Sequence, residues 1–569
     1  MRIAKLRGAV DSIHAAALLI GGAGLCSRLL GILRDRMLAT HFGASRSLDI
    51  YYAAFQIPDF LFTLFLLGAA SAAIIPVLTE MGEERGVESA RFIRELGTIF
   101  VMAAIGFSLI TILLAPLLVR WSAPGFGPAE RTIVISLTRV MMASPVLLGL
   151  SNIVSAVLQA RRRFFAFALA SVFYNLGIIF GILVFLPRWG LVGLAYGVIL
   201  GAAGHLAVQM PAFISLGFGI PFSWPTWRLR ISSPVKRVFA LSVPRVVAIS
   251  ASNLTSIGLV ALASTLEPGS ISIFQFANNL RYVPIGLFGV SFAVAAFPAL
   301  SRLALRGSSE EFYRALFGTM RSVLLWVLPT TVFSYVLRAH IVRLALGAGR
   351  FGWHDTRLTA ALLGIFALAI ITESLSAVLI RAFYALGNTK KPLLINVSTA
   401  ILTVMLAFVL ARLFQNQDLF LVRGAMRLLR VEGVGGAGIV GVACAVAIGD
   451  VLDFLFLLWG LRSQMRRRFP SGAGAYADGA DVAMMGAAAA LAGFASYVAL
   501  RPLNMVVSLD RFSGVFIQAA AACLAGLGVY VGALLISGNR EIRELAGAVR
   551  RHAFGLGVLP AEWDGASMK

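Results

Sequence analysis

Long apolar runs recur along this chain from one end to the other, and they constrain its fold more than any other feature. Each run is about 20–30 residues long, which is enough for an α-helix to cross a bilayer. Of the 569 residues, 59% are hydrophobic and only 13% are charged, whereas soluble proteins carry about 25% charged residues. The strands of a β-barrel would be about ten residues long and would alternate in polarity. The sequence therefore predicts an all-α polytopic membrane protein.

The apolar runs predict about fourteen transmembrane helices. Their expected ranges are roughly 11–42, 47–79, 96–119, 132–159, 164–187, 190–217, 238–264, 271–300, 315–345, 358–386, 392–412, 434–461, 481–501 and 512–537. Two connecting segments have their own patterns. Residues 79–95 are charged and mixed, which predicts a solvated amphipathic linker. Residues 416–432 alternate arginines with large apolar side chains, which predicts a surface helix on the outer leaflet.

The formal net charge of +23 is explained by topology. Basic clusters such as 161–163, 228–237, 390–391 and 466–468 fall on alternate loops of the predicted helices. Cytoplasmic loops carry such an excess of Lys and Arg, so both termini are expected in the cytoplasm. This distribution excludes nucleic acid as the expected partner. Anionic lipid headgroups of the membrane are expected partners instead.

A faint internal repeat divides the chain into lobes. Three short motifs recur in the same order with a spacing of about 220 residues, which spans an even number of helices. The pairs are 73–79 with 295–301, 155–158 with 376–379, and 27–32 with 244–249. Two parallel six-helix lobes are therefore expected, followed by two extra helices. The predicted domains are 1–220 (first lobe), 221–433 and 434–465 (second lobe), 466–537 (the two extra helices) and 538–569 (a basic cytoplasmic tail).

The first apolar segment contains an unusual cluster of charges. By helical period, Gly24, Arg28, Gly31 and Asp35 share one face, and Arg34 lies about 80–100° away. An intramembrane charge costs about 2.5–3.5 kcal/mol on insertion scales, so such residues usually line a cavity. Arginine binds phosphate through a planar fork, and glycines make room for a ligand. The cluster predicts an anion site, with Asp35 as an internal partner; an Arg28–Asp35 ion pair or snorkelling is the alternative.

The second helix offers a further candidate. Asp49 lies near its outer end, and Pro58 is expected to kink the helix towards a cavity. Asp49 is predicted to contact substrate, and Pro58 to shape the cavity or act in gating. Simple exposure of Asp49 to water is the alternative.

The eighth helix carries a polar stripe. Asn278, Asn279 and Arg281 precede Pro284 there, in a pattern suited to a sugar or peptide headgroup plus phosphate. Ordinary interhelical hydrogen bonding is the alternative. Arg245, the repeat counterpart of Arg28, is expected to act in structure or gating, as is Pro284.

Patterns typical of catalysis are absent from the sequence. It contains no Walker A loop, catalytic triad, HExxH or CxxC pair, so no catalytic residue, metal site or cofactor is predicted. The chain is not expected to be an enzyme. Transport would be driven by the membrane potential or by a gradient, with a coupling monovalent ion as one option.

Several blocks resemble the lipid II flippase (MurJ/MviN) family. They are SRLLGILRD (27–35), FGAS…LDIYYAAFQIPDFL (42–61), GAASAAIIPVLTE (68–80), RRRFFAFALASVFYNLGIIFG (161–181), FANNLRYVPIGLFGVSFAVAAFPALSR (276–302) and RAFYALGNTKKP (381–392). The resemblance implies the fold of the multidrug/oligosaccharidyl-lipid/polysaccharide exporter superfamily, with two lobes around a cationic cavity. It also implies that 466–537 forms a groove for the lipid tail.

The family's functional residues carry over in part. Its two helix 1 arginines match Arg28 and Arg34, and its helix 2 aspartate matches Asp49. The Arg-Arg pair and Glu common in the family's second helix are replaced here by Phe62, Thr63 and Leu67. The family's helix 8 arginine aligns with Asn279, two residues before Arg281. A bend at Pro284 would return Arg281 to the cavity.

The resemblance implies a flippase in the bacterial inner membrane. Its substrate would be lipid II, the undecaprenyl-pyrophosphate-linked peptidoglycan precursor, moved from the inner to the outer leaflet by alternating access. Two alternatives stay open at this point. One is an exporter of another lipid-linked glycan or an amphiphilic drug, and the other is a non-transporting membrane scaffold.

Overall fold

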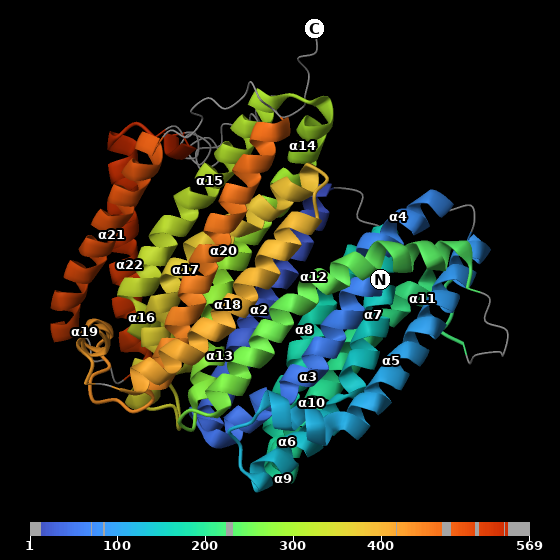
Figure 1. Cartoon of the computed structure of the whole chain (residues 1–569), viewed down its shortest axis with the longest axis horizontal. Helices are drawn as coiled ribbons and strands as arrows, with labels where there is room; N and C mark the ends of the chain where they lie inside the picture. The colour runs from blue at the N-terminus through green and yellow to red at the C-terminus, as the bar shows by residue number, and fades with distance from the viewer. Residues whose placement is uncertain are drawn as a thin grey trace, which may run out of the picture. The chain divides into compact units, whose positions relative to one another are not determined.

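The computed structural model describes residues 13–69, 71–82, 86–223, 231–416, 418–468, 479–506, 511–539 and 541–543. Side chains are described for these residues except at 13–20, 65–69, 71–73, 241–252 and 503–506. Every regular element in these ranges is a helix (Figure 1). The all-α fold predicted from the sequence is thus confirmed. The predicted tail, 538–569, lies almost entirely outside the described residues.

The chain forms two compact units, each assembled from separate segments. The first comprises 1–283, 342–366 and 390–453, and the second comprises 284–341, 367–389 and 454–569. These units differ from the repeat-based lobes, whose boundaries stay a prediction.

The first unit contains most of the N-terminal helices. They are α2 (Ile13–Phe42), α3 (Arg46–Ala69), α4 (Ser71–Met81), α5 (Gly86–Ser122), α6 (Pro128–Met141), α7 (Ala143–Ala160), α8 (Phe164–Phe180), the π-helix η1 (Gly181–Phe185), α9 (Leu186–Trp189), α10 (Leu191–Ala207), α11 (Met210–Ser215), α12 (Ser233–Ser264), α13 (Ser270–Pro284), α18 (Lys390–Gln415) and α19 (Phe420–Leu429).

The second unit contains η2 (Ile285–Val290), α14 (Ser291–Arg306), α15 (Ser309–Val336), α21 (Gly479–Val506) and α22 (Phe512–Ile536). Its α21 and α22 pack side by side (Figure 1). Four helices contribute residues to both units: α13, through its last residue Pro284, and α16 (Arg338–Leu346), α17 (Trp353–Ala385) and α20 (Ala437–Arg468).

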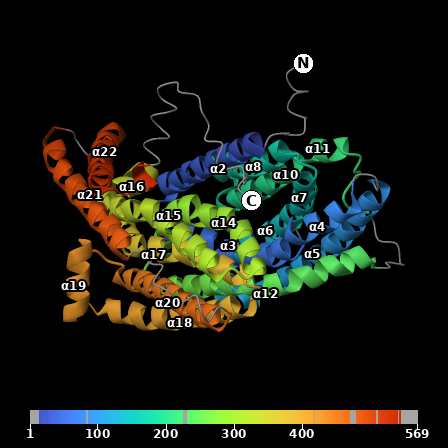
Figure 2. The same cartoon turned by 90° about the horizontal axis from the view of Figure 1, so that it is seen from above.

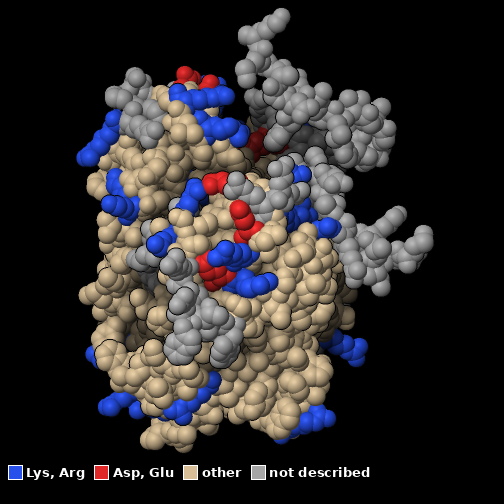
Figure 3. Space-filling model, turned by 90° about the vertical axis from the view of Figure 1, so that its right-hand side faces the viewer, with Lys and Arg blue, Asp and Glu red and all other residues tan. Residues whose placement is uncertain are grey.

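The helices have the length and composition of membrane spans. Among the described residues, 11 helical segments are long and apolar enough to cross a membrane. The three remaining predicted spans fall on α2, α3 and α12, each of which includes residues without described side chains. Figure 3 shows large uncharged areas on the visible face, with charged side chains in its upper half and at its centre and further Lys and Arg along its lower edge. The chain is thus a multi-pass membrane protein.

The prediction of a solvated linker over 79–95 is wrong for the second half of this segment. Residues from Gly86 onward belong to α5, and Phe92, Ile93 and Leu96 are buried in the core of the first unit. The surface helix predicted within 416–432 is present as α19, which buries Val422 and Met426.

In the first unit, α8 packs between α2 and α10 (Figure 2). The α8–α10 contact is made by glycines whose backbones nearly touch. A Cβ added at Gly177 would lie 2.3 Å from the Cα of Gly201, and one at Gly181 would lie 2.5 Å from the Cα of Gly197. Small residues permit such approach in membrane helices. This contact fixes α8, which supports the charged part of α2.

Candidate functional site

The charged cluster of α2 lines a cavity of about 280 Å³ in the first unit. The side chains around it come from α2, α13 and α16. They are Arg28, Gly31, Ile32, Arg34, Asp35, Phe276, Asn279, Leu280, Tyr282, Val283, Ala345 and Leu346. The structure therefore brings together five residues selected from the sequence: Arg28, Gly31, Arg34, Asp35 and Asn279. Arg34 joins Arg28 at this cavity although the helical period separates the two positions.

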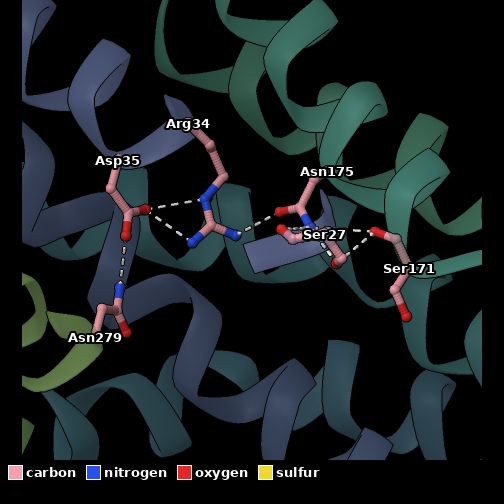
Figure 4. A network of polar contacts seen from close by, with 6 residues as sticks. All are labelled: Ser27, Arg34, Asp35, Ser171, Asn175 and Asn279. Carbon is pink, nitrogen blue, oxygen red and sulfur yellow. Dashed lines mark hydrogen bonds and ion pairs between the residues drawn. The ribbon is translucent and has the colours of Figure 1, made fainter. Parts of the chain in front are cut away.

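A chain of polar contacts holds Arg34 in place (Figure 4). Its Nε and Nη2 donate to Asp35 Oδ1 at 3.0 and 2.8 Å. The other oxygen of Asp35 accepts from Asn279 Nδ2 at 2.9 Å. On the far side, Arg34 Nη1 donates to Asn175 Oδ1 at 3.3 Å. Asp35 is thus the internal partner that the sequence predicted, but its cation is Arg34 and not Arg28.

Asn175 of α8 anchors this chain of contacts. Its amide nitrogen donates to Ser27 Oγ at 3.1 Å and to the Ser171 carbonyl at 3.1 Å. Sequence reasoning did not select Asn175, Ser27 or Ser171 as site residues. The available signal was an amide in the otherwise apolar stretch FYNLG, within one of the family-like blocks.

Arg28 is bound less tightly than Arg34. Its Nη1 donates to the Val283 carbonyl at 2.9 Å, and the residue is otherwise exposed. Val283 lies beside Pro284, where α13 gives way to the π-helix η2. A carbonyl is a neutral acceptor, so an anion entering the cavity would compete for the Arg28 guanidinium at an advantage.

Arg34 also borders two neighbouring cavities in the same unit. One, of about 250 Å³, is lined by Tyr51, Tyr52, Gln56 and Gln275 among others. The other, of about 320 Å³, includes Pro58, Asp59 and His205 in its lining. Pro58 therefore faces a cavity, as predicted, while α3 continues through it. The Arg34 side chain thus lines all three cavities.

Asp49 is buried, with 1% of its surface exposed. Its carboxylate accepts from the backbone N–H groups of Gly269 at 2.6 Å and Ser272 at 2.8 Å, and from Ser272 Oγ at 2.7 Å. These donors lie at the N-terminus of α13, where helix N–H groups lack internal partners. The exposure considered from the sequence is excluded. Asp49 holds the start of the helix that carries Asn279.

Arg281 is also buried and does not line the α2 cavity. Its Nη1 donates to Asp450 Oδ2 of α20 at 2.9 Å. The guanidinium also lies 4.6 Å from the ring centroid of Phe366. The change from α-helix to π-helix at Pro284 does not return Arg281 to the cavity.

The remaining candidates lie around the same region. Asn278 is half-buried and is not part of the α2 cavity lining. Gly24 is exposed, with open space where a Cβ would lie. The side chain of Arg245 lies outside the described residues.

Comparison with known proteins identifies the family. The model of the lipid II flippase MurJ family matches residues 38–507 of this chain. The chain belongs to the lipid II flippase MurJ family. A probable lipid II flippase MurJ of Rhizobium tropici is 31% identical over 389 residues, covering 66% of this chain and 71% of that protein. The lipid II flippase MurJ of Burkholderia cenocepacia is 26% identical over 458 residues, covering 80% of this chain and 84% of that protein.

Solved structures show the same fold. A lipid II flippase MurJ in an inward closed conformation matches with a TM-score of 0.69 at 20% identity, covering 93% of this chain and all of that one. A MATE family transporter of the MOP superfamily in an inward-facing conformation matches with a TM-score of 0.60 at 15% identity, covering 79% of this chain and 96% of that one. The MurJ family member described here thus shares its fold with multidrug transporters.

Proposed function

We propose that this protein is a lipid II flippase of the bacterial inner membrane. It moves undecaprenyl-pyrophosphate-linked peptidoglycan precursor from the inner to the outer leaflet by alternating access, with both termini in the cytoplasm. The observation that carries the proposal is the placement of Arg28 and Arg34, two cations of one apolar helix, on one cavity. The cycle involves transport without a chemical step, so the chain is not an enzyme.

Arg28 and Arg34 bind the pyrophosphate in this proposal. Arg34 presents its fork to Asp35 in the described state. Both N–H groups share one oxygen of Asp35, whereas a phosphate group offers two oxygens for two parallel charge-assisted bonds, so the substrate replaces Asp35 at the guanidinium. Asp35 keeps its bond to Asn279 and so remains partnered. Because the phosphate and Asp35 replace each other at Arg34, the guanidinium keeps an anionic partner while the substrate enters and leaves.

The α13 residues contribute to headgroup binding. Asn279 lines the α2 cavity and offers amide hydrogen bonds to a sugar or peptide headgroup. Asn278, one position along, is proposed to contact the same headgroup when the cavity opens. Direct contact by Asp49 or Arg281 stays a prediction, because each would have to release its present partners. Gly24, Arg245 and Pro284 are proposed to act in gating, and membrane lipids surround the helices.

The decisive experiment measures flipping by purified protein in vesicles containing labelled lipid II. The amount of label reached by a membrane-impermeant reagent is followed over time. Wild type is expected to expose label steadily, whereas Arg28→Ala and Arg34→Ala each lose most of the activity. Charge-assisted hydrogen bonds contribute about 1.5–3 kcal/mol, so each loss is about 10- to 100-fold.

Two further variants make this experiment specific. Arg412→Ala, at an exposed position of α18, is the matched control and retains activity. Arg34→Lys keeps the charge but loses the fork, so its activity falls between wild type and Arg34→Ala. Wild-type rates in both α2 variants would refute the assignment. If the protein moves another lipid-linked glycan or a drug but not lipid II, the proposed substrate is wrong, while the assignment of the fold is unaffected.

A further inference from the structure

The proposed flippase cycle uses Arg34 but leaves two titratable groups beside it without a role. Asp59 of α3 and His205 of α10 line the same cavity of about 320 Å³, together with Arg34 and Asn175. All of these residues belong to the first unit. The cavity therefore adjoins the proposed substrate site through a shared arginine.

Asp59 and His205 lie at similar distances from the starts of their helices. α3 begins at Arg46 and α10 at Leu191. With a rise of 1.5 Å per residue, each residue is about 20 Å along its helix, a position expected within the hydrocarbon core of a bilayer about 30 Å thick. An acid at that depth costs about 2.5–3.5 kcal/mol on insertion scales, and Asp and His in such places commonly relay protons. Asp59 makes no hydrogen bond or ion pair with the residues whose side chains the structure describes.

A hydrogen-bonded chain fixes the His205 ring. Nδ1 lies 2.7 Å from Ser151 Oγ, which also accepts from Gln209 Nε2 at 2.7 Å. Gln209 is fully buried, and its Oε1 accepts from Ser155 Oγ at 2.7 Å. The Ser151 oxygen has a second lone pair, which accepts from the Nδ1–H of the neutral ring in the tautomer whose Nε2 carries no proton. The ring is thereby held through Nδ1. The lone pair of Nε2 is then available to accept a proton in the cavity that His205 lines.

The charged and titratable groups around Asp59 come from each neighbouring helix. Arg34 of α2, Tyr174 of α8 and His205 of α10 face it across the larger cavity, and Tyr51 and Tyr52 of α3 share the 250 Å³ cavity with it. Arg34 directs its N–H groups to Asp35 and Asn175. A permanent cation on the same cavity disfavours the binding of a metal cation there. A proton instead binds covalently to Asp59 and neutralises it, so no separate ion has to occupy the cavity beside Arg34.

We propose that Asp59 and His205 form a proton site coupled to transport. A proton from the outer aqueous phase adds to the Asp59 carboxylate, forming an O–H bond, and later leaves unchanged towards the cytoplasm. His205 relays it by accepting the proton at Nε2 and returning it, while its Nδ1 stays bonded to Ser151. The inference rests on the proposed flippase function for its coupling to lipid movement, since proton entry then accompanies outward lipid movement.

Two measurements on the full-length protein test this site. The first is infrared difference spectroscopy during a pH titration without substrate. Wild type is expected to show a carboxylic acid C=O band that appears on acidification and is missing in Asp59→Asn. Asp59→Glu restores a shifted band, and Asp418→Asn, at an exposed position near α19, leaves it unchanged. A wild-type band that persists in Asp59→Asn, or that responds to Na⁺ at constant pH, overturns the proposal.

The second measurement is lipid II flipping in vesicles with the membrane potential clamped. An imposed pH gradient is expected to raise the wild-type rate several-fold, while Asp59→Asn and His205→Gln respond little or not at all. Active wild type without any gradient response overturns the coupling but leaves the flippase assignment intact. An inactive wild type that still shows the Asp59 band overturns the flippase assignment and keeps the proton site.

Discussion

Asp49 of α3 accepts hydrogen bonds from both the backbone N–H and the hydroxyl of Ser272 in α13, at 2.8 and 2.7 Å. A carboxylate in one helix thus accepts hydrogen bonds from N–H groups at the N-terminus of another helix, more than 200 residues away in the chain. The positive end of the α13 dipole stabilises the buried charge. Because α13 carries Asn279, this bond positions one wall of the α2 cavity.

Removal of this carboxylate should destabilise the protein. Loss of a helix N-cap costs about 0.5–2 kcal/mol, and Asp49→Ala also leaves buried donors unpaired. We expect a lower midpoint of thermal unfolding in detergent for Asp49→Ala, and a smaller decrease for Asp49→Asn, which keeps one acceptor. An Asp49→Ala protein with wild-type stability but no flipping would instead place Asp49 in contact with substrate.

The Arg281–Asp450 pair should behave as a structural bond. Removal of one partner of a buried ion pair costs about 3–5 kcal/mol, whereas replacement of both by apolar residues is often nearly neutral. Arg281→Leu should therefore unfold at a clearly lower temperature than the double variant Arg281→Leu/Asp450→Leu. If the folded double variant flips no lipid II, Arg281 has a role in transport beyond this pair.

The glycine contact between α8 and α10 should tolerate no added side chain. A Cβ at Gly177 would lie 2.3 Å from backbone atoms of Gly201, so Gly177→Ala forces the helices apart. We expect a severe loss of folded protein, measured by size-exclusion chromatography of the detergent extract. Gly106→Ala in α5 is the control, because nothing lies within 4 Å of its added Cβ. Equal yields of the two variants would contradict this packing.

In the second unit, Arg321 should hold the residues that follow α22. Its guanidinium donates to Asp481 at 2.9 Å and to Glu541 at 2.8 Å. These groups are partly exposed, so Arg321→Ala should cost only about 1 kcal/mol. Hydrogen exchange should nevertheless speed up at residues 541–543. Arg314→Ala, which removes an exposed pair with Glu310, should leave that exchange unchanged.

The sequence was sufficient for the fold because helix length and hydropathy are local properties. The start of α5 was missed since its charged composition hides a stripe of Ser89, Phe92, Ile93 and Leu96, which the helical period turns inward. Among the residues that line the α2 cavity, Arg28, Arg34 and Asn279 could be predicted because they are polar groups that are costly to place in apolar helices. The partner of Arg281 could not be predicted, because Asp450 lies 169 positions away and only the tertiary fold brings the two together.

The glycine contact has a mechanical consequence. Because the backbones of α8 and α10 touch at their glycines without side chains between them, we expect the two helices to move together as one rigid body. His205 is carried by α10, close to Gly201, and Asn175 by α8, close to Gly177. We therefore expect a displacement of the His205 ring to reach Asn175, and through it the guanidinium of Arg34, because the close contact leaves the two helices little room to move relative to each other.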